Sequence, residues 1–427
     1  MIHQVKFRTI CAFLLFYTLH VGEVNAQNLK QVFRETFTVS VTNPLAQPRS
    51  DVAAFIPATE IRNAIPAFNP DAFVVLDGKK EIPSQYNSKD NLQAGIILVL
   101  DQMAPKAART LTIRYNEKGT YQHKYAKRTQ AELSNKFGGH FENKKYIGGE
   151  FRNVDSLRVP DEHTDHSFFI RYEGPGWESD KVGYRFYLDW RNGTDVFGKT
   201  TPDMVLQQVG LDGFDSYHEL QPWGMDVLKV GKSLGVGTLG MFVEDHAQRI
   251  EKTDSIISKI TENGPVYSSI LTNYYGWQVA GQDLDVQSLL SIHAGTRLTH
   301  HQVQVTGGTP ENLVTGLNKD KTARLFKSKG NDKQWGYLAT YGAQSLNKDK
   351  LGIAVLFRPQ DFMAFTEDAN SHVVKLKPTN GKLDYYFLAA WELEPQGIKT
   401  EEQFLEYLNK TAQELAAPVQ VHVNSSK

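Results

Sequence analysis

The segment "YEGPGWESDKVGYRFYLDWRN", residues 172–192, decides the fold because apolar and polar side chains alternate along it. Such alternation predicts a β-strand that buries one face. The apolar face would hold Val182, Tyr184, Phe186, Leu188 and Trp190. The opposite face would hold Lys181, Gly183, Arg185, Tyr187, Asp189 and Arg191. We therefore expect a core on one side of this strand and a row of polar groups on the other.

The rest of the chain repeats this strand pattern with few helical segments. Short alternating runs such as "FTVSVTN" and "RTLTIRYN" predict a small β-sandwich over residues 27–125. Residues 126–145 are polar, contain the helical-looking piece "AKRTQAELSNKF", and are predicted to link two domains. From residue 146 to 427, runs such as "SSILTNYYGWQVA" and "LGIAVLFRP" predict a large antiparallel β-sandwich of the supersandwich kind.

The segment "TEEQFLEYLNKTAQELAAP" near the C-terminus is the clearest helix. Thr400 and Gln403 have the spacing of a capping box. An apolar stripe runs along Phe404, Leu408, Ala412 and Leu415, so we expect the helix to pack on an outer sheet face. The predicted fold is therefore all-β, with two sandwiches and a C-terminal helix.

The first 26 residues have the features of a secretory signal peptide. Lys6 and Arg8 precede an apolar core, and small residues lead to a cleavage site after Ala26. Cys11, the single cysteine, lies inside that core rather than at a lipid-attachment position. We expect a periplasmic or secreted protein that is not inserted in a membrane after cleavage and that uses no thiol chemistry.

The overall charge argues against a nucleic-acid partner. The chain of 427 residues has a net charge of −1, whereas phosphate binding requires clustered Lys and Arg on a basic domain. The sequence also lacks a phosphate-binding glycine loop, a nucleophile elbow and a zinc-protease motif. No cofactor is expected, although a divalent metal is not excluded.

The polar face of the 181–191 strand is the first candidate binding surface. Arg185, Tyr187, Asp189 and Arg191 would stand roughly 6–7 Å apart at alternate positions and could hold an extended anionic ligand. An exposed ladder of ion pairs is the alternative interpretation. The preceding loop presents Trp177 beside Glu178, where the indole would either stack on a sugar or cap the core.

Two further segments offer catalytic or metal-binding groups. The segment "SYHELQPWGMDVLKVGKS" contains His218, Trp223, Asp226 and Lys229, a combination that suits proton transfer, although His218 could also be structural. The segment "DEHTDHS" contains His163, Asp165 and His166, which are weak metal-ligand candidates because short runs of this kind are usually polar loops.

Two long stretches resemble a family of secreted bacterial polysaccharide-degradation proteins, the family of the ulvan oligosaccharide dehydratase. They are "HTDHSFFIRYEGPGWESDKVGYRFYLDWRNGTDVFGK" and "YHELQPWGMDVLKVGKSLGVG". The resemblance is dense from residue 146 to 240 and looser elsewhere. It implies removal of water across C4–C5 of a non-reducing-end glucuronic or iduronic acid linked to sulfated rhamnose. The expected partner is then an anionic oligosaccharide.

This chemistry makes demands that the candidate residues could meet. The C5 proton becomes acidic only when the adjacent carboxylate is neutralised, for which Arg185 and Arg191 are the candidates. His218 would act as base or acid together with Tyr187 or Tyr172, with Lys229 in reserve. We expect the remaining substrate contacts from Trp177, Glu178, Trp223, Asp226 and Asp189.

Three alternative functions share parts of this pattern. A glycoside hydrolase would use Glu178 with either Glu173 or Asp189 as its two carboxylates. A non-catalytic protein would only hold the sugar, through Trp177, Trp223 and the arginines. An epimerase or polysaccharide lyase would share the abstraction of the C5 proton.

Overall fold

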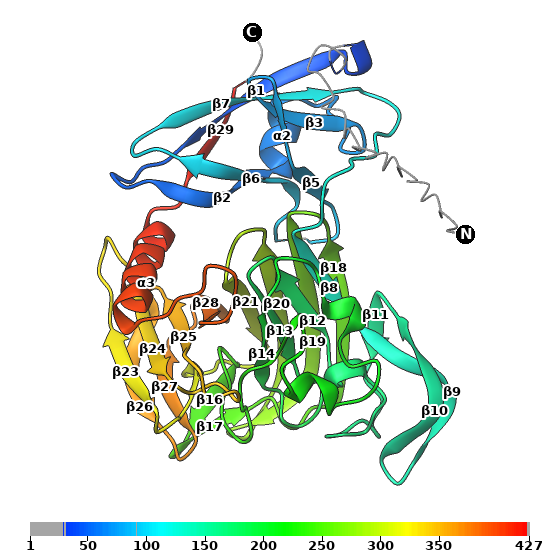
Figure 1. Cartoon of the computed structure of the whole chain (residues 1–427), viewed down its shortest axis with the longest axis vertical. Coiled ribbons are helices and arrows are strands. Elements are labelled where there is room, and N and C mark those ends of the chain that lie inside the picture. Colours follow the sequence, from blue (N-terminus) through cyan, green and yellow to red (C-terminus); the bar gives the residue numbers. More distant parts are fainter. Residues whose placement is uncertain (1–28, 30, 91, 425–427) are drawn as a thin grey trace, which may run out of the picture.

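The computed structural model describes residues 29, 31–90 and 92–424 (Figure 1). The predicted signal peptide, with Cys11, lies outside the described residues. Within them, none of the helices combines the length and the apolar character that crossing a bilayer requires. The described chain is built mainly of antiparallel strands, which confirms the predicted all-β class.

The N-terminal sandwich consists of a five-stranded and a three-stranded sheet around an apolar core that includes Phe37, Ile56 and Leu98. Its elements are β1 (Glu35–Thr42), β2 (Arg49–Pro57), α2 (Ala58–Ala64), β3 (Phe73–Asp77), β4 (Lys80–Ile82), β5 (Ser84–Asn87), β6 (Gly95–Met103) and β7 (Ala108–Tyr115). The edge strand of the five-stranded sheet comes from the other end of the chain. It is β29 (Gln420–Asn424), which pairs antiparallel with β1.

The large sandwich has a nine-stranded sheet and two five-stranded sheets. The long sheet contains, in spatial order, β11 (Ser156–Arg158), β18 (Ser255–Asn263), β19 (Tyr267–Val279), β20 (Gln282–His293), β21 (Leu298–Thr306), β28 (Lys382–Trp391), β25 (Leu351–Phe357), β24 (Gly336–Gly342) and β23 (Ala323–Ser328). One apolar cluster joins it to both smaller sheets and includes Trp177, Trp277 and Phe387.

Each five-stranded sheet covers part of the long one. The first contains β15 (Gly224–Asp226), β14 (Thr194–Lys199), β13 (Val182–Phe186), β12 (Gly176–Ser179) and β8 (Thr129–Glu132). The second contains β17 (His246–Arg249), β16 (Gly240–Val243), β22 (Leu313–Asn318), β27 (Ser371–Leu376) and β26 (Phe362–Glu367). The opening segment of the sequence therefore forms the centre of the first of these sheets.

The predicted linker, residues 126–145, contains strands rather than a helix. It forms β8 and then β9 (Ser134–Glu142), which pairs with β10 (Lys145–Asn153) in a two-stranded hairpin. The hairpin projects from the body of the protein (Figure 1). The helical-looking pattern is overridden because β8 pairs with β12 and completes the edge of that sheet.

The C-terminal helix α3 (Glu401–Ala416) forms as predicted. The Thr400 side chain accepts a hydrogen bond from the Gln403 backbone N–H (3.2 Å), while the Gln403 side chain accepts one from the Lys399 N–H (2.9 Å). Phe404 stacks on Tyr341 of β24 with ring centroids 5.3 Å apart. The helix thus covers the outer face of the long sheet, as its apolar stripe predicts.

The alternation in the opening segment ends sooner than the sequence suggests. β13 stops at Phe186 and the chain then turns, with the Asn192 N–H donating to the Asp189 carbonyl oxygen (3.0 Å). Trp190, predicted to lie in the core, is 46% exposed because it lies in this turn. The prediction for Trp190 was therefore wrong, while Val182, Tyr184, Phe186 and Leu188 are buried as expected.

Candidate functional site

A buried network of charged side chains surrounds Arg185 at the centre of β13. The guanidinium Nη2 lies 2.9 Å from Asp195 Oδ2 and 2.5 Å from Asp226 Oδ2, and Nη1 donates to the Tyr217 hydroxyl (2.8 Å). Tyr187 donates its hydroxyl proton to the same oxygen of Asp195. Arg185 is only 2% exposed, so the two carboxylates and two phenols enclose it. We call these five residues the Arg185 network.

Arg191 extends the network toward the surface. Its guanidinium lies 2.7 Å from Glu173, 2.9 Å from Asp165 and 2.5 Å from Asp189. Glu173 also lies 4.0 Å from Arg185 and so connects the two arginines. Burial alone would raise the pKa of Glu173, but Arg185 and Arg191 outweigh it, so that this pKa is lowered.

His218 lies at the solvent-facing rim of the network. Its side chain is 44% exposed, and Nε2 lies 3.5 Å from Asp226 Oδ2. Partial burial and the charge of Arg185 lower the pKa of His218, so that the imidazole is neutral at pH 7. Burial and the neighbouring Asp195 raise the pKa of Asp226 well above its ordinary value. A neutral, accessible imidazole thus has a buried carboxyl group behind it.

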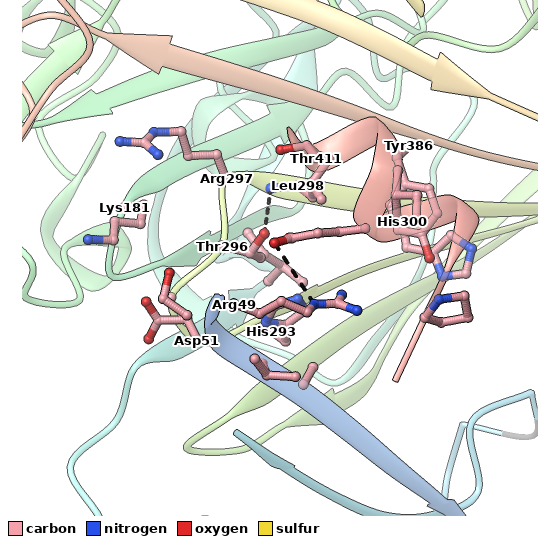
Figure 2. A pocket seen from close by; sticks show the side chains of 18 of the residues that line it. Arg49, Asp51, Lys181, His293, Thr296, Arg297, Leu298, His300, Tyr386 and Thr411 are labelled. Carbon is pink, nitrogen blue, oxygen red and sulfur yellow. Dashed lines mark hydrogen bonds and ion pairs between the residues drawn. The ribbon is translucent and has the colours of Figure 1, made fainter. Parts of the chain in front are cut away.

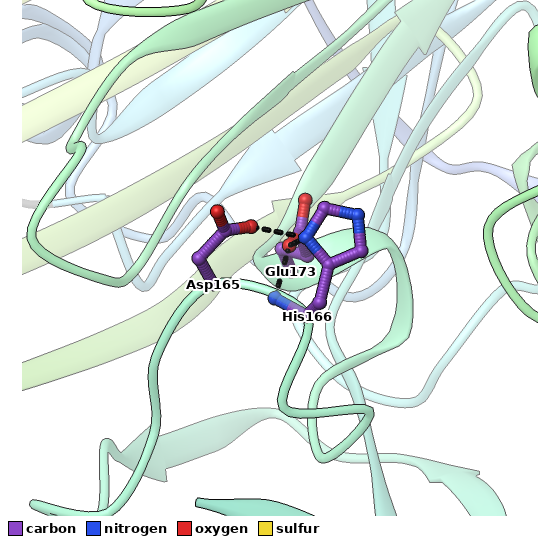
Figure 3. A group of neighbouring side chains, drawn as sticks. All are labelled: Asp165, His166 and Glu173. Carbon is purple, nitrogen blue, oxygen red and sulfur yellow. Dashed lines mark hydrogen bonds and ion pairs between the residues drawn. The ribbon is translucent and has the colours of Figure 1, made fainter.

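A second exposed imidazole, that of His166, lies 3.8 Å from Glu173 (Figure 3). Its Nδ1 forms a hydrogen bond with the Asp165 carboxylate. Its backbone N–H donates to Glu173 Oε1 (2.9 Å). The His166 ring is 4.9 Å from that of Phe214, whose ring is 6.4 Å from that of Tyr217. Since the Tyr217 ring in turn lies 4.7 Å from that of His218, the aromatic pair separates the two histidines.

The backbone that carries Glu173 is strained. Tyr172 and Glu173 have positive φ angles of 38° and 72°, which are costly for residues with a side chain. Gly174 follows, and a Cβ there would lie 1.8 Å from the Phe186 carbonyl oxygen. The glycine of "EGPG" thus allows the two segments to approach closely, which places Glu173 between the arginines.

Three ligand groups in this region could hold a metal ion. One ligand atom from each of Asp165, His166 and Glu173 lies within 4.8 Å of the others (Figure 3). Arg191 already pairs with both carboxylates, and its charge competes with that of a metal. His163, predicted in this group, is not part of it: the side chain is buried and Nδ1 is 2.8 Å from Ser167 Oγ. Glu173 takes its place.

A hollow of about 170 Å³ adjoins the network. Its lining residues are Lys136, Phe151, Phe168, Tyr172 and the segment 210–214. Phe214 belongs both to this lining and to the contact with His166. The Lys136 ammonium lies 5.2 Å from the centre of the Phe151 ring and supplies a cation to the hollow. Sequence reasoning missed Lys136 because its segment was predicted to be a linker.

Trp177 and Glu178 lie away from the rim, which corrects their prediction as sugar contacts. Trp177 is 1% exposed, stacks on Tyr184 and donates its Nε1–H to Thr299 Oγ1 (2.8 Å). Glu178 is fully buried and lies 2.6 Å from Lys199 Nζ, with the Val205 backbone N–H donating to its other oxygen (2.8 Å). Both side chains hold the sheet together and are closed to a substrate.

The other predicted residues divide into buried and exposed ones. Tyr172 and Tyr187 are buried, and burial raises the pKa of both phenols, so neither ionises near pH 7. Trp223 is half-buried with its ring edge toward Phe197. Lys229 is exposed, and no contact within the described chain joins its ammonium to the network. Trp223 and Lys229 therefore have no visible part in the network.

Asp195 and Tyr217 were missed by sequence reasoning although they contact Arg185 directly. A signal for Asp195 exists in the register, because β13 and β14 pair so that Arg185 is opposite Asp195. Tyr217 comes from the short 3-10 helix Ser216–His218, whose position follows only from tertiary packing. The network therefore includes a cross-strand pair, Arg185 and Asp195, and a phenol from a connecting segment, that of Tyr217.

Comparisons with known proteins place the chain among homologues of undetermined function. A family model described as a domain of unknown function (DUF4861) matches residues 41–421. None of the curated proteins matches the sequence. Two solved structures from Enterococcus faecalis are similar in part. One is a protein in the glycosyl hydrolase family 38, with a TM-score of 0.44, 10% identity and coverage of 92% of this chain and 48% of that chain.

The second solved structure is an alpha-mannosidase, with a TM-score of 0.40 and 9% identity. The match covers 94% of this chain and 48% of that one. This chain thus spans about half the length of each of the two structures.

Proposed function

The chain belongs to the DUF4861 family, and we propose that it is a hydro-lyase that removes water across C4–C5 of a terminal uronic acid in an anionic oligosaccharide. The resemblance of residues 163–199 to the ulvan oligosaccharide dehydratase family suggests this reaction. The native substrate would be a uronyl-rhamnose sulfate oligosaccharide from ulvan. The product would carry a 4,5-unsaturated uronyl end.

The observation that carries this proposal is the pairing of His218 with the buried carboxyl group of Asp226. Abstraction of a C5 proton requires a neutral base that substrate can reach, and His218 is both exposed and of lowered pKa. The Arg185 network behind it fixes Asp226 and so orients the imidazole. Among the acid–base residues predicted from the sequence, His218 is the one that combines access with a buried partner.

Recognition of the uronate would come from the hollow beside the network. Lys136 lines this hollow and could neutralise the substrate carboxylate and so acidify the C5 proton, whereas Arg191 is already paired with three carboxylates. Phe168 and Phe214 provide flat apolar walls for the sugar ring. Arg185, the sequence candidate for this role, is enclosed and instead positions the residues around it.

Dehydration must move one proton from carbon and deliver one to oxygen. His218 takes the C5 proton, the C5 electron pair forms the C4–C5 double bond, and the 4-hydroxyl leaves as water after protonation. The His218 imidazolium can return this proton to the 4-hydroxyl, which is syn to the C5 hydrogen in glucuronic acid, because the aromatic pair between the two histidines holds His166 away from His218. The buried Tyr172 and Tyr187, predicted from the sequence for this step, keep their protons.

A glycoside hydrolase remains the rival within carbohydrate chemistry. It requires two carboxyl groups that flank the scissile bond. Glu178 is locked by Lys199, while Glu173 and Asp189 are both bound by Arg191. These carboxylates are therefore occupied, which ranks the dehydratase above the hydrolase.

Product analysis separates these reactions. The protein is incubated with saturated glucuronyl-rhamnose sulfate oligosaccharides, and mass and ultraviolet absorbance are followed. Loss of one water together with a new enoate absorbance is the expected result. Chain shortening would instead identify a hydrolase or lyase, and an unchanged oligosaccharide would overturn the proposed reaction.

We also propose that the protein works in the periplasm or outside the cell. The signal-peptide pattern of residues 1–26 supports this place. Intact-mass measurement of the protein from cell fractions tests it. We expect the mature chain to begin at Gln27 in the periplasmic or culture fraction, and recovery from the cytoplasm with residue 1 intact would contradict the proposal.

A further inference from the structure

A larger cavity, of about 780 Å³, lies between the N-terminal sandwich and the large sandwich. It is bounded by β2, by the turn between β20 and β21, and by the C-terminal half of α3 (Figure 2). Its volume lies within the range of sites that bind small molecules. None of its lining residues belongs to the Arg185 network or to the hollow beside it. The chain thus offers a second concave site.

The charges of this interdomain cavity are unequal. The lining has five cationic side chains, Arg49, Lys181, Arg297, Arg358 and Lys410, and two carboxylates, Asp51 and Glu414. Three of the cations and both of the acids are already in ion pairs. Arg49 lies 3.9 Å from Glu414, Arg297 lies 2.6 Å from Glu394, Arg358 pairs with Asp384, and Asp51 lies 2.8 Å from Arg128.

The remaining two cations of the lining are Lys181 and Lys410. No hydrogen bond or ion pair within the described chain engages the ammonium groups of Lys181 and Lys410. The Arg49 Nε–H is also buried without a hydrogen-bond partner, although Arg49 Nη1 donates to the Ala417 carbonyl oxygen (3.0 Å). The oxygen that faces this Nε is Glu414 Oε1, which lies 3.9 Å away and likewise has no hydrogen-bond partner, so these two groups can satisfy each other. The two lysines are therefore the groups that favour an anionic ligand.

Flat rings form another wall of the interdomain cavity. The His300 imidazole stacks on Tyr386 with centroids 4.2 Å apart and planes 5° from parallel. Trp335 packs its ring against Tyr386 at 5.5 Å. Aromatic walls combined with a few polar groups are typical of sites for ligands that have both an apolar face and polar edges. A sugar ring with an anionic substituent has this chemistry.

We propose that the interdomain cavity is a second glycan-binding site that holds a carboxylated or sulfated sugar unit away from the reacting end. Lys181 and Lys410 bind the anionic group, and the His300–Tyr386 pair carries the ring. The expected class of sugar rests on the proposed function, whereas binding at this cavity can be measured without turnover. The site would retain long oligosaccharides through a second contact.

Calorimetric titration with a defined probe tests this site. The probe is a sulfated, glucuronate-containing chondroitin tetrasaccharide, compared with its desulfated form and with neutral cellotetraose. We expect two binding events in the native chain and only one in Lys181→Ala/Lys410→Ala, with the remaining affinity unchanged. The desulfated probe shows whether the carboxylate suffices, and cellotetraose should not bind at the cavity.

The control variant is Lys118→Ala, which removes an exposed lysine from the N-terminal sandwich. It should retain both binding events. Retention of both events in the double variant, or equal binding of cellotetraose, would overturn the proposal.

Turnover of short substrates separates this proposal from the proposed function. The double variant should keep kcat on a disaccharide within twofold, because the cavity lies outside the Arg185 network. Loss of that turnover in a folded double variant would show that the cavity is the reaction site and would overturn the second-site proposal. Loss of dehydration in every protein, with two binding events intact, would overturn the proposed function alone.

Discussion

His218 Nε2 lies 3.5 Å from Asp226 Oδ2, and this contact joins the solvent-exposed rim to a deeply buried carboxyl group of the network. The imidazole is 44% exposed while the carboxyl side chain is 2% exposed. Such a pairing of an accessible titratable group with an enclosed one is a frequent feature of proton-transfer sites. It provides the basis for the first two predictions.

Replacement of His218 by asparagine should abolish dehydration without unfolding the protein. We expect kcat to fall by roughly 10²–10⁴-fold, the usual contribution of a general base, because no other neutral imidazole contacts Asp226 in the described chain. Enoate absorbance gives kcat, and thermal unfolding reports stability. The matched control is His246→Asn, another exposed histidine beside an aspartate (3.5 Å), which should retain full activity.

The pH dependence of the reaction should follow His218. Because its pKa is lowered from 6.5, kcat/KM should rise with pH along a limb below pH 6.5 and then level off. Burial and Asp195 already raise the pKa of Asp226, so the neutral amide of Asp226→Asn should leave this limb near its native position while the protein stays folded. A native kcat/KM that does not fall below pH 6.5 would remove His218 from the role of base.

Arg185 should prove essential for stability as well as for activity. Arg185→Ala leaves Asp195 and Asp226 buried without their counter-ion, and the free energy of unfolding should fall by about 3–5 kcal/mol. Urea denaturation measures this loss. Arg62→Ala, at an exposed position of α2, should change the same quantity by less than about 0.5 kcal/mol. A fully stable Arg185→Ala would contradict the enclosed geometry.

Chelator treatment should leave dehydration unchanged, because Arg191 supplies the cation between Asp165 and Glu173. In Arg191→Ala this competing charge is gone and three ligand groups remain, so the variant should bind Zn²⁺ more tightly than the native chain. Equilibrium dialysis with Zn²⁺ measures the difference. Inactivation of the native protein by a chelator, reversed by Zn²⁺, would show that a metal acts there.

Glu394 should make the protein less stable as the pH rises from 5 to 7. Burial raises the pKa of Glu394 to about 7 against an ordinary value of 4.5, despite the nearby Arg297. Between these values the folded state binds more protons than the unfolded state, so the free energy of unfolding falls as pH rises, by on the order of 2–3 kcal/mol.

The matched pair of variants is Glu394→Gln and Glu406→Gln. The first should flatten the dependence of stability on pH between pH 5 and 7, since its side chain does not titrate. The second changes an exposed position of α3 and should retain the slope of the native protein. Chemical denaturation at several pH values measures both, and equal slopes in the two variants would refute the assignment.

The sequence predicted the fold class better than the surroundings of its polar residues. Alternation identified the buried face of β13 because side-chain direction in a strand has a period of two. It failed at Trp190 because alternation cannot say where a strand ends and turns. Residues 126–145 were predicted to be a linker for a similar reason. Residues 129–132 form β8, and the pairing of β8 with β12 depends on the tertiary structure, which the local pattern does not report.

The candidate site was predicted in part. Arg185, Arg191, His218 and Asp226 do come together, although they lie on two separate segments of the sequence, residues 172–192 and 216–233. The prediction that Arg185 meets the ligand failed because polar residues on an alternating strand can face a second buried layer. His166 was considered only as a metal ligand, because its nearness to Phe214 depends on the fold. The catalytic roles themselves stay predictions.

The pairing of β29 with β1 has a consequence for biosynthesis. Thr38 is opposite Asn424, so an edge of the first domain is made by residues that leave the ribosome after the whole of the large sandwich. The N-terminal sandwich therefore cannot complete its five-stranded sheet while the large sandwich is still being made. Its last strand arrives only after the large sandwich and α3 have been synthesised, which ties maturation of the first domain to synthesis of the second.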